Sequence, residues 1–193
     1  MSRTVVTKAN EREFSKFLSF ILRHHPEEIG LRLEDNGWVN TSELIKAINN
    51  HEASKWVIDL SILEQIVTND IKGRYSFNNS KTKIRANQGH SIKSLNIEFT
   101  EVENPPEFLY HGTSVQNKDL IYSSGCIKPM NRQMVHLSKD EDTAIKVGKR
   151  HGKCAVLVIN ALKLLNSNHK IFISDNGVYL TDLVPINCIE YIK

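Results

Sequence analysis

Several arginines lie beside predicted turns or at the ends of predicted elements, where a side chain can reach a ligand. They are Arg23, next to His24, and then Arg74, Arg85, Arg132 and Arg150. A guanidinium can hold two phosphate oxygens at once, so arginines at such positions fit a phosphate-bearing ligand. Taken singly, each arginine also fits an ordinary surface position. His24 also fits a residue that contacts the last carbonyl groups of a helix.

The motifs of several common hydrolases are absent from the sequence. It has no Gly-x-Ser-x-Gly elbow, no Walker phosphate-binding loop and no His-Glu-x-x-His metal helix. Its three cysteines, Cys126, Cys154 and Cys188, are widely spaced and odd in number. We therefore expect buried free thiols rather than disulfides or a zinc site, and we expect no metal.

A basic stretch runs from Lys72 to Lys93 without a single acidic residue. It contains one histidine and six cationic side chains: Lys72, Arg74, Lys81, Lys83, Arg85 and Lys93. A stretch of this kind fits a phosphate-rich partner such as RNA, and it equally fits a solvated hairpin that happens to be basic.

The first half of the sequence has the pattern of three helices followed by a hairpin. Apolar residues at helical spacing predict a helix over 14–22 that stops before Pro26. Leu31 and Leu33 alternate with charged residues, which predicts a short strand, and Asn36-Gly37 predicts a turn. Further helices are expected after Asn40 and near Asp59. Strands at 75–77 and 83–85, joined by a turn at 78–80, complete a layout typical of a winged helix.

The second half is richer in strands. Residues 101–107 contain Pro105-Pro106 and are expected to form a linker. Strands are predicted at 108–111, 135–137, 155–159, 171–173, 178–180 and 186–192. Ser114 is expected to cap a helix that Gly125 ends, and a second helix is expected over 140–150.

The composition fits a globular α+β protein with two lobes, residues 1–100 and residues 101–193. Of the 193 residues, 40% are hydrophobic and 24% are charged, which is enough apolar material for a core. No apolar run is long enough to cross a membrane, and residues 1–11 lack an apolar signal segment. We therefore expect a cytoplasmic protein, not bound to a membrane, with a monomer as the default state.

Several ordered segments together resemble the NAD-dependent RNA 2′-phosphotransferase family, whose members complete tRNA splicing in eukaryotes and occur widely in bacteria and archaea. The segments are LRH at 22–24, GW at 37–38, DIKGRY at 70–75, IRANQGHS at 84–91, LYHGT at 109–113, MNRQMVHLS at 130–138, VGKRHG at 147–152 and SDNGVYLT at 174–181. Their order and spacing cover nearly the whole chain. The chain departs from the family at Gln133-Met134, where the family often has a basic residue followed by histidine.

This resemblance implies a fold and an activity. The fold would be an N-terminal winged-helix lobe that binds RNA, followed by an ADP-ribosyltransferase-like split β-sheet lobe that binds NAD as co-substrate. The activity would be removal of an internal 2′-phosphate from RNA, as at a tRNA splice junction. The reaction would pass through a 2′-phospho-ADP-ribosylated RNA intermediate and give RNA 2′-OH, nicotinamide and ADP-ribose 1″,2″-cyclic phosphate.

The resemblance also implies roles for individual residues. The catalytic set would be Arg23, His24, Arg74 and Arg132. The cofactor-binding residues would be His111, Gly112, Thr113, His136, Ser138 and Arg150. The residues that contact RNA phosphates or hold the cleft would be Arg85, Gln88, His90 and Ser91. Two alternatives stay open for single residues, since His136 also fits a hydrogen-bonded core histidine, and Arg150 with His151 also fits a helix cap.

Two other functions remain compatible with the sequence. The first keeps NAD but transfers ADP-ribose to a terminal phosphate of a nucleic acid or to a protein. A stable product that still carries ADP-ribose would favour it. The second is a non-catalytic winged-helix protein that binds nucleic acid, which salt-dependent binding without NAD binding would favour.

Overall fold

A computed structural model describes residues 3 to 192 of the chain. The chain divides into two compact units, one that ends at Glu98 and one that begins at Phe99. Each unit has its own hydrophobic core and is described by itself. Helices and mainly antiparallel strands occur together, as expected for an α+β protein.

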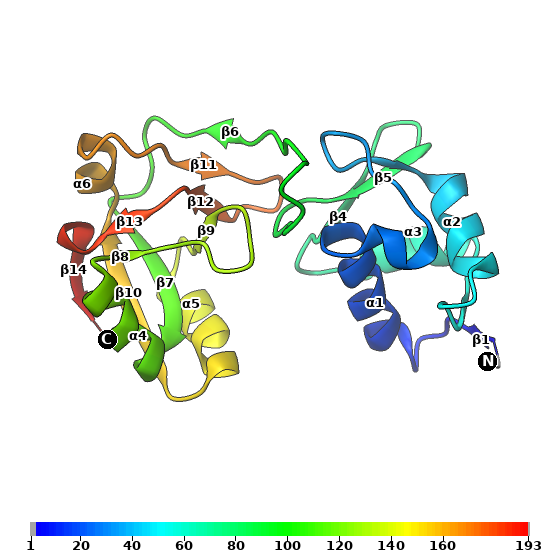
Figure 1. Cartoon of the computed structure of the whole chain (residues 1–193), viewed down its shortest axis with the longest axis horizontal. Coiled ribbons are helices and arrows are strands. Elements are labelled where there is room, and N and C mark those ends of the chain that lie inside the picture. Colours follow the sequence, from blue (N-terminus) through cyan, green and yellow to red (C-terminus); the bar gives the residue numbers. More distant parts are fainter. Residues whose placement is uncertain (1–2, 193) are drawn as a thin grey trace. The chain divides into compact units, whose positions relative to one another are not determined.

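Three helices and a hairpin form the first unit, as predicted from the sequence (Figure 1). The helices are α1 (Glu11–Arg23), α2 (Thr41–Asn50) and α3 (Leu60–Asn69), with the short 3₁₀ helix η1 (Pro26–Ile29) after α1. The side chain of Asn40 accepts hydrogen bonds from the N–H groups of Ser42 and Glu43, and that of Asp59 accepts one from Ile62. These caps satisfy N–H groups that the first helical turn leaves open, so they fix where α2 and α3 begin.

The hairpin of the first unit belongs to a three-stranded antiparallel sheet in the order β2-β5-β4. Its strands are β2 (Val39–Asn40), β4 (Tyr75–Phe77) and β5 (Lys83–Ala86). A separate parallel pair, β1 (Thr4–Val5) with β3 (Trp56–Val57), was not expected from the sequence. The core contains the fully buried Phe14, Leu18, Leu44, Leu63 and Ile84, which come from all three helices and β5. Packing of α1 onto the hairpin therefore fixes the end of α1 relative to β4 and β5.

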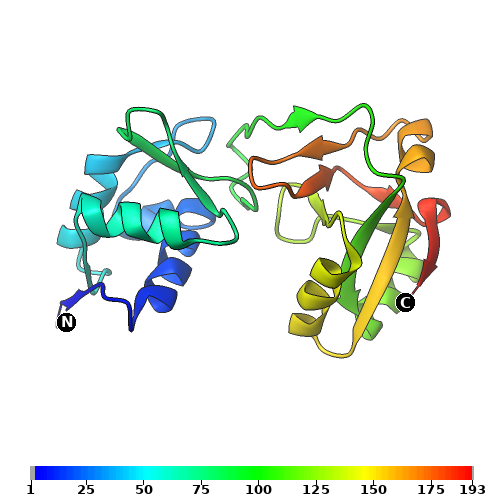
Figure 2. The ribbon, with the colours of Figure 1, turned by 180° about the vertical axis from the view of Figure 1, so that it is seen from behind.

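Two sheets form the centre of the second unit, seen from both sides in Figures 1 and 2. One has the order β14-β10-β7, with β7 (Phe108–Ser114), β10 (Cys154–Asn160) and β14 (Ile189–Ile192). The other has the order β6-β11-β12-β9, with β6 (Thr100–Glu101), β9 (Val135–Leu137), β11 (Phe172–Ile173) and β12 (Tyr179–Thr181). The backbones of Tyr110 and Ser138 join β7 to the end of β9 through hydrogen bonds of 2.9 and 2.8 Å. A small pair, β8 (Cys126–Ile127) with β13 (Val184–Pro185), completes the strands.

The helices of the second unit are α4 (Val115–Ser124), α5 (Glu141–Gly148) and α6 (Ala161–Asn166), with the 3₁₀ helices η2 (Lys149–His151) and η3 (Ile186–Cys188). Ser114 caps α4 and Gly125 ends it in a left-handed conformation, as the sequence predicts. Helix α5 lies so close to β7 that a Cβ atom on Gly112 would fall 1.8 Å from the carbonyl oxygen of Ala144. Glycine at 112 is therefore required by the approach of α5 to the strand.

Three predicted elements differ in the structure. Residues 31–34 form no strand, although Leu31 is buried and Leu33 packs against the core, because this segment has no neighbouring strand to pair with. Residues 100–101, at the edge of the expected linker, form β6 and pair with β11 in the second unit. The last predicted strand begins at Ile189, because 186–188 form η3. Among the expected buried thiols, only Cys188 is fully buried, and all three cysteines are free.

Candidate functional site

Arg23 and His24 lie at the C-terminal end of α1. Arg23 is the last helical residue, and His24 is the cap, with its N–H donating to the carbonyl oxygen of Phe20 at 3.0 Å. The Nε and Nη2 atoms of Arg23 are shielded from solvent. A Cβ atom on Gly89 would lie 3.6 Å from the Arg23 Nη1 atom, an ordinary van der Waals distance, so Gly89 faces the guanidinium. The amphipathic helix thus presents Arg23 to a second segment of the same unit.

Arg74 lies just before β4 and is held by Asp70. The Asp70 carboxylate accepts hydrogen bonds from both the Arg74 guanidinium and the Arg74 backbone N–H. Only 5% of the Asp70 side chain is exposed, so this ion pair is better shielded from water than a surface pair. The hydroxyl of the adjacent Tyr75 donates to the backbone oxygen of Ser15 at 2.6 Å, which ties β4 to α1.

The segment 87–91 contacts Arg74 at one end and both Arg23 and His24 at the other. The N–H of Asn87 donates to the carbonyl oxygen of Arg74 at 2.8 Å. At the other end, the N–H of Ser91 donates to the carbonyl oxygen of Arg23 at 3.0 Å, and the Ser91 hydroxyl is 2.9 Å from the Nδ1 atom of His24. Five residues of chain span about 18 Å at most. The structure therefore brings Arg23, His24 and Arg74 together along one segment.

His90, in the middle of this segment, is buried with 2% of its surface exposed. Neither of its ring nitrogens has a hydrogen-bond partner among residues 3–192. Burial lowers the pKa of His90 to about 4, and repulsion from Arg23, His24 and Arg85 lowers it in the same direction. His90 is therefore neutral at pH 7. Of its two predicted roles, burial favours holding the cleft over contact with RNA.

Arg85 and Gln88 flank the same region and are half-buried. The Arg85 guanidinium lies over the ring of Trp38, 4.7 Å from its centroid, and donates to the side-chain oxygen of Asn36 at 3.3 Å. These contacts hold Arg85 against the turn at 36–38, the turn that the sequence predicts.

The basic stretch of the hairpin is paired with acids from elsewhere in the first unit. Lys83 lies 2.7 Å from Glu34, and Lys81 lies 3.0 Å from Glu64. The absence of acids within 72–93 therefore overstates how much positive charge this surface offers to a ligand. This pairing was not visible in the sequence, because each acid is distant along the chain.

In the second unit, His111 lies on β7 and His136 on β9. The Nδ1–H of His111 donates to the carbonyl oxygen of His136 at 3.0 Å, and the Nδ1–H of His136 donates to the carbonyl oxygen of Met134 at 3.0 Å. A carbonyl oxygen can only accept, so each bond places the proton on Nδ1. Burial lowers the pKa of His111 and outweighs the hydrogen bond to His136, which raises it; repulsion from His151 and Arg132 also lowers the pKa, by smaller amounts. His111 is therefore neutral at pH 7, with Nε2 as a hydrogen-bond acceptor.

The other predicted cofactor residues lie around this pair of histidines. Thr113 is buried on β7, and Ser138 follows β9 at the bridge to Tyr110. Gly112 lies between His111 and Thr113 on β7, with the backbone of α5 covering one of its sides.

Arg132, Arg150 and His151 give this region of the second unit a positive potential. Surrounding protein atoms lower the pKa of Arg132, and repulsion from Arg150 lowers it further. Repulsion from His151 and Arg132 lowers the pKa of His111. Cations that repel one another in this way are stabilised by a bound anion. Arg150 and His151 lie in η2, directly after α5, so both the capping role and a ligand-binding role remain compatible with their position.

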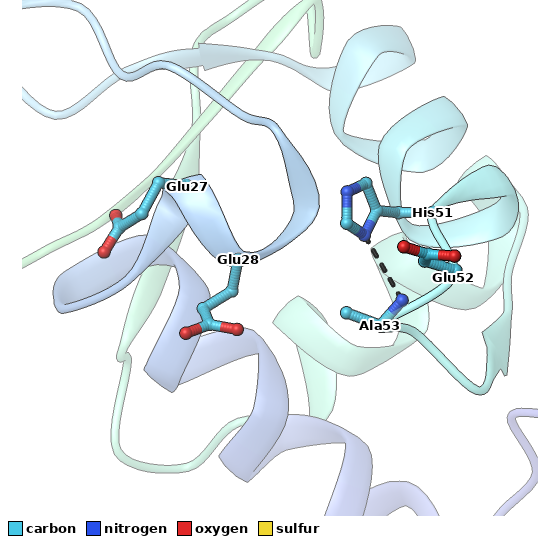
Figure 3. Close-up of a pocket in the computed structure, with 5 residues that line it drawn as sticks. All are labelled: Glu27, Glu28, His51, Glu52 and Ala53. Carbon is cyan, nitrogen blue, oxygen red and sulfur yellow. Dashed lines mark hydrogen bonds between the residues drawn. The ribbon is translucent and has the colours of Figure 1, made fainter.

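A cavity of about 670 Å³ lies elsewhere in the first unit, between η1 and the loop after α2. It is lined by Glu27, Glu28, His51, Glu52 and Ala53, none of which was predicted as a site residue (Figure 3). Its three carboxylates would repel a phosphate, so the cavity does not fit the ligand that the arginines fit. Within residues 3–192, no group of three His, Cys, Asp or Glu side chains could hold a metal ion. No helix in that range is long and apolar enough to cross a membrane.

Two residues that support the site were not singled out from the sequence. Asp70 precedes Arg74 by four positions, a spacing that could have pointed to an ion pair had the segment been helical. Trp38 was noted only as part of a turn, and its stacking under Arg85 has no signal in the sequence.

Comparison with known proteins identifies the family of the chain. The sequence profile described as "RNA 2′-phosphotransferase, Tpt1 / KptA family" matches residues 9–183. A protein of Fusobacterium nucleatum named "Probable RNA 2′-phosphotransferase" is 49% identical over 183 residues, which is 94% of this chain and 99% of that protein. Proteins with the same name from Flavobacterium johnsoniae and Trichormus variabilis are 44% and 45% identical, over 93% and 92% of this chain and 96% and 94% of their own lengths. A match of this extent shows that the chain belongs to the RNA 2′-phosphotransferase family.

Proposed function

We propose that this protein removes an internal 2′-phosphate from RNA and that NAD is the acceptor. The observation that carries the proposal is the convergence of Arg23, His24 and Arg74 on the segment 87–91. These residues come from separate parts of the sequence, and the matched relatives bear the name of this activity. A protein that only bound nucleic acid would not need such a set, so the enzyme reading is favoured over the non-catalytic one.

The chemistry of the side chains in the second unit fits NAD. His111 is neutral and offers Nε2 as an acceptor, which suits the hydroxyl or amide N–H groups that NAD carries. Arg132 and Arg150 repel one another, which suits the negative pyrophosphate. We therefore propose His111, His136, Ser138 and Arg150 as NAD-binding residues, with Gly112 and Thr113 forming the strand beneath them.

When bound, NAD would supply an electrophilic ribose C1″ with nicotinamide as the leaving group, and then its O2″ as the nucleophile of a second step. The residues of the chain would position the 2′-phosphate and stabilise its negative charge. Arg23, Arg74 and Arg132 would hold the 2′-phosphate, whose oxygens gain negative charge during phosphoryl transfer. His24 would donate a hydrogen bond or move a proton at the same phosphate. A phosphate dianion is already nucleophilic, which agrees with a site that has no pair of carboxylates.

The finer assignments follow from the same proposal. We infer that the first unit is a winged-helix lobe that binds RNA and that the second is an ADP-ribosyltransferase-like lobe. The substrate would be an RNA with a 2′-phosphate of the kind left at a tRNA splice junction. A cytoplasmic monomer would suffice for this reaction.

The test is to incubate the purified protein with NAD and three oligonucleotides, carrying an internal 2′-phosphate, a terminal phosphate or no phosphate. The proposal expects nicotinamide, ADP-ribose 1″,2″-cyclic phosphate and RNA 2′-OH from the first oligonucleotide alone. A stable ADP-ribosylated product from the terminal phosphate would instead establish the rival transferase. Absence of any NAD consumption, with salt-dependent RNA binding intact, would establish the binding protein.

A further inference from the structure

The three residues 89–91 each contact or support the pair Arg23 and His24. Gly89 faces the Arg23 guanidinium. The Ser91 N–H donates to the Arg23 carbonyl oxygen at 3.0 Å, and its hydroxyl lies 2.9 Å from the Nδ1 atom of His24. Ser91 thus contacts both the backbone of Arg23, which precedes His24 in the chain, and the Nδ1 edge of the His24 ring. A two-point contact of this kind restricts the rotation of the imidazole.

His90 anchors this tripeptide in the first unit. Its ring is buried, and a Cβ atom on Gly37 would lie 3.2 Å from the His90 Nε2 atom and 2.9 Å from Ile97. The backbone of Gly37, which has a φ of +74°, therefore covers the His90 ring closely. Because His90 is neutral at pH 7, it adds no positive charge beside Arg23 and His24. The hydroxyl of Ser91 is consequently held in place by its neighbour in the chain.

A serine hydroxyl has a property that suits a histidine beside phosphate. It can donate one hydrogen bond and accept others. Toward a neutral His24 it can donate to Nδ1, with the ring proton on Nε2, or accept from Nδ1–H of the other tautomer. Toward a protonated His24 it accepts from Nδ1–H, and Nε2 again carries a proton. When the hydroxyl donates to the neutral ring, Nε2 is therefore a donor in both charge states, which is what a phosphate oxygen requires.

We propose that Ser91 is a positioning residue that orients His24 and keeps a proton on its Nε2 atom. This role makes more specific the second of the two that the sequence resemblance implied for Ser91, contact with RNA phosphates or holding the cleft. It deepens the proposed function and rests on it where activity is concerned, because His24 would act on the 2′-phosphate through Nε2.

The first test reads the tautomer directly, without activity. Nitrogen-15 NMR of the imidazoles in the full chain, at a pH where His24 is neutral, should show the His24 proton on Nε2, with the signal assigned by its loss in His24→Gln. In Ser91→Ala the two tautomers should mix, and Ser91→Thr should restore the wild-type pattern. Ser94→Ala is the matched control, since Ser94 is an exposed serine three residues away. An unchanged tautomer in Ser91→Ala would overturn the proposal.

The second test uses turnover of 2′-phosphorylated RNA. Ser91→Ala should lower kcat by about tenfold, the effect of losing one net hydrogen bond, and should change the pH profile. In a His24→Ala background, Ser91→Ala should have no further effect. An equal loss in both backgrounds would mean a merely structural role and would overturn the proposal. Failure of the wild-type protein to act on this RNA would refute the proposed function instead, and the NMR result would still decide the role of Ser91.

Discussion

The two units hold their candidate polar residues by different means. In the first unit side chains hold side chains, as Ser91 does for His24 and Asp70 does for Arg74. In the second unit backbone carbonyl groups hold the rings of His111 and His136. Substitution can remove a side-chain partner and leave the candidate residue in place. It cannot remove a backbone carbonyl, so His111 and His136 cannot be separated from their partners by substitution in the same way.

This difference has a chemical consequence. A hydroxyl beside Nδ1 leaves the opposite edge of His24 able to donate a hydrogen bond, whereas a carbonyl beside Nδ1 makes the opposite edge of neutral His111 an acceptor. Donors suit a phosphate, and acceptors suit hydroxyl and amide N–H groups. His24 and His111 thus differ in the direction of the hydrogen bond they can offer, which matches the proposed phosphate contact of His24 and the proposed NAD contact of His111.

The largest expected effect comes from removing one cation of each unit. Arg74→Ala and Arg132→Ala should each slow phosphate removal several hundredfold, a loss of about 3–4 kcal/mol by analogy with one oxyanion donor. Because charge on the phosphate grows in phosphoryl transfer, we expect the second step to slow more than the first. Rapid-quench analysis should then show ADP-ribosylated RNA accumulating.

Arg12→Ala is the matched control, since Arg12 is an exposed arginine on α1. A slow reaction in one arginine variant but a normal one in the other would show that only one of the two arginines is needed for phosphate removal. A loss of rate without any accumulated intermediate would reassign these arginines to the first step.

A packing effect in the second unit comes next. Gly112→Ala should lower the free energy of unfolding by about 3 kcal/mol, because its Cβ atom would overlap the Ala144 carbonyl oxygen. Chemical denaturation followed by circular dichroism measures the loss. Gly177→Ala is the control, because a Cβ atom there meets open space and only the φ of +76° is unfavourable. Equal losses in the two variants would mean that the contact with α5 is not what requires glycine.

An acid-dependent loss of stability is expected in the first unit. His90 has a pKa of about 4 when folded and 6.5 as its reference value, so the unfolded chain binds more protons between these limits. The contribution of His90 to the free energy of unfolding is fully present above pH 6.5 and is lost as the pH falls toward 4. From about pH 7.5 to about pH 5, His90 should account for a loss of about 2 kcal/mol.

Tryptophan fluorescence can follow this loss, because both tryptophans, Trp38 and Trp56, belong to the first unit. The variant His90→Gln should be less stable at neutral pH but should lose less stability on acidification. An acid dependence identical to that of the wild-type protein would show that other groups cause it.

The smallest effect is expected at the paired lysines of the hairpin. Lys83→Ala should change the free energy of unfolding by about 0.5 kcal/mol at most, since its ion pair with Glu34 is exposed. If the pair also keeps Lys83 from RNA, the salt dependence of RNA binding should stay nearly unchanged. A clear decrease in the salt dependence of RNA binding would instead show that Lys83 contacts an RNA phosphate. The basic stretch would then fit an RNA-binding surface, one of the two interpretations that the sequence allows.

Local signals explain what the sequence predicted well. Asn40, Asp59 and Ser114 cap the helices expected to follow them, and Gly125 ends α4, because caps depend on residues within one turn. The strand expected at Leu31 and Leu33 is absent, because strand formation depends on a partner that alternation alone cannot supply. The pairing of Thr100 with Ile173 illustrates the reverse case, in which a partner distant along the chain makes a strand that has no local pattern.

The sequence by itself determined which residues could bind phosphate, because residue type and motif order are local properties. It also determined most helix ends, since capping acts within one turn. Only the tertiary structure decided how these residues are held: His90 buried and neutral, Ser91 against His24, and Lys83 paired with Glu34. Each of these contacts joins residues far apart along the chain or depends on burial, and neither can be read from the order of residues alone.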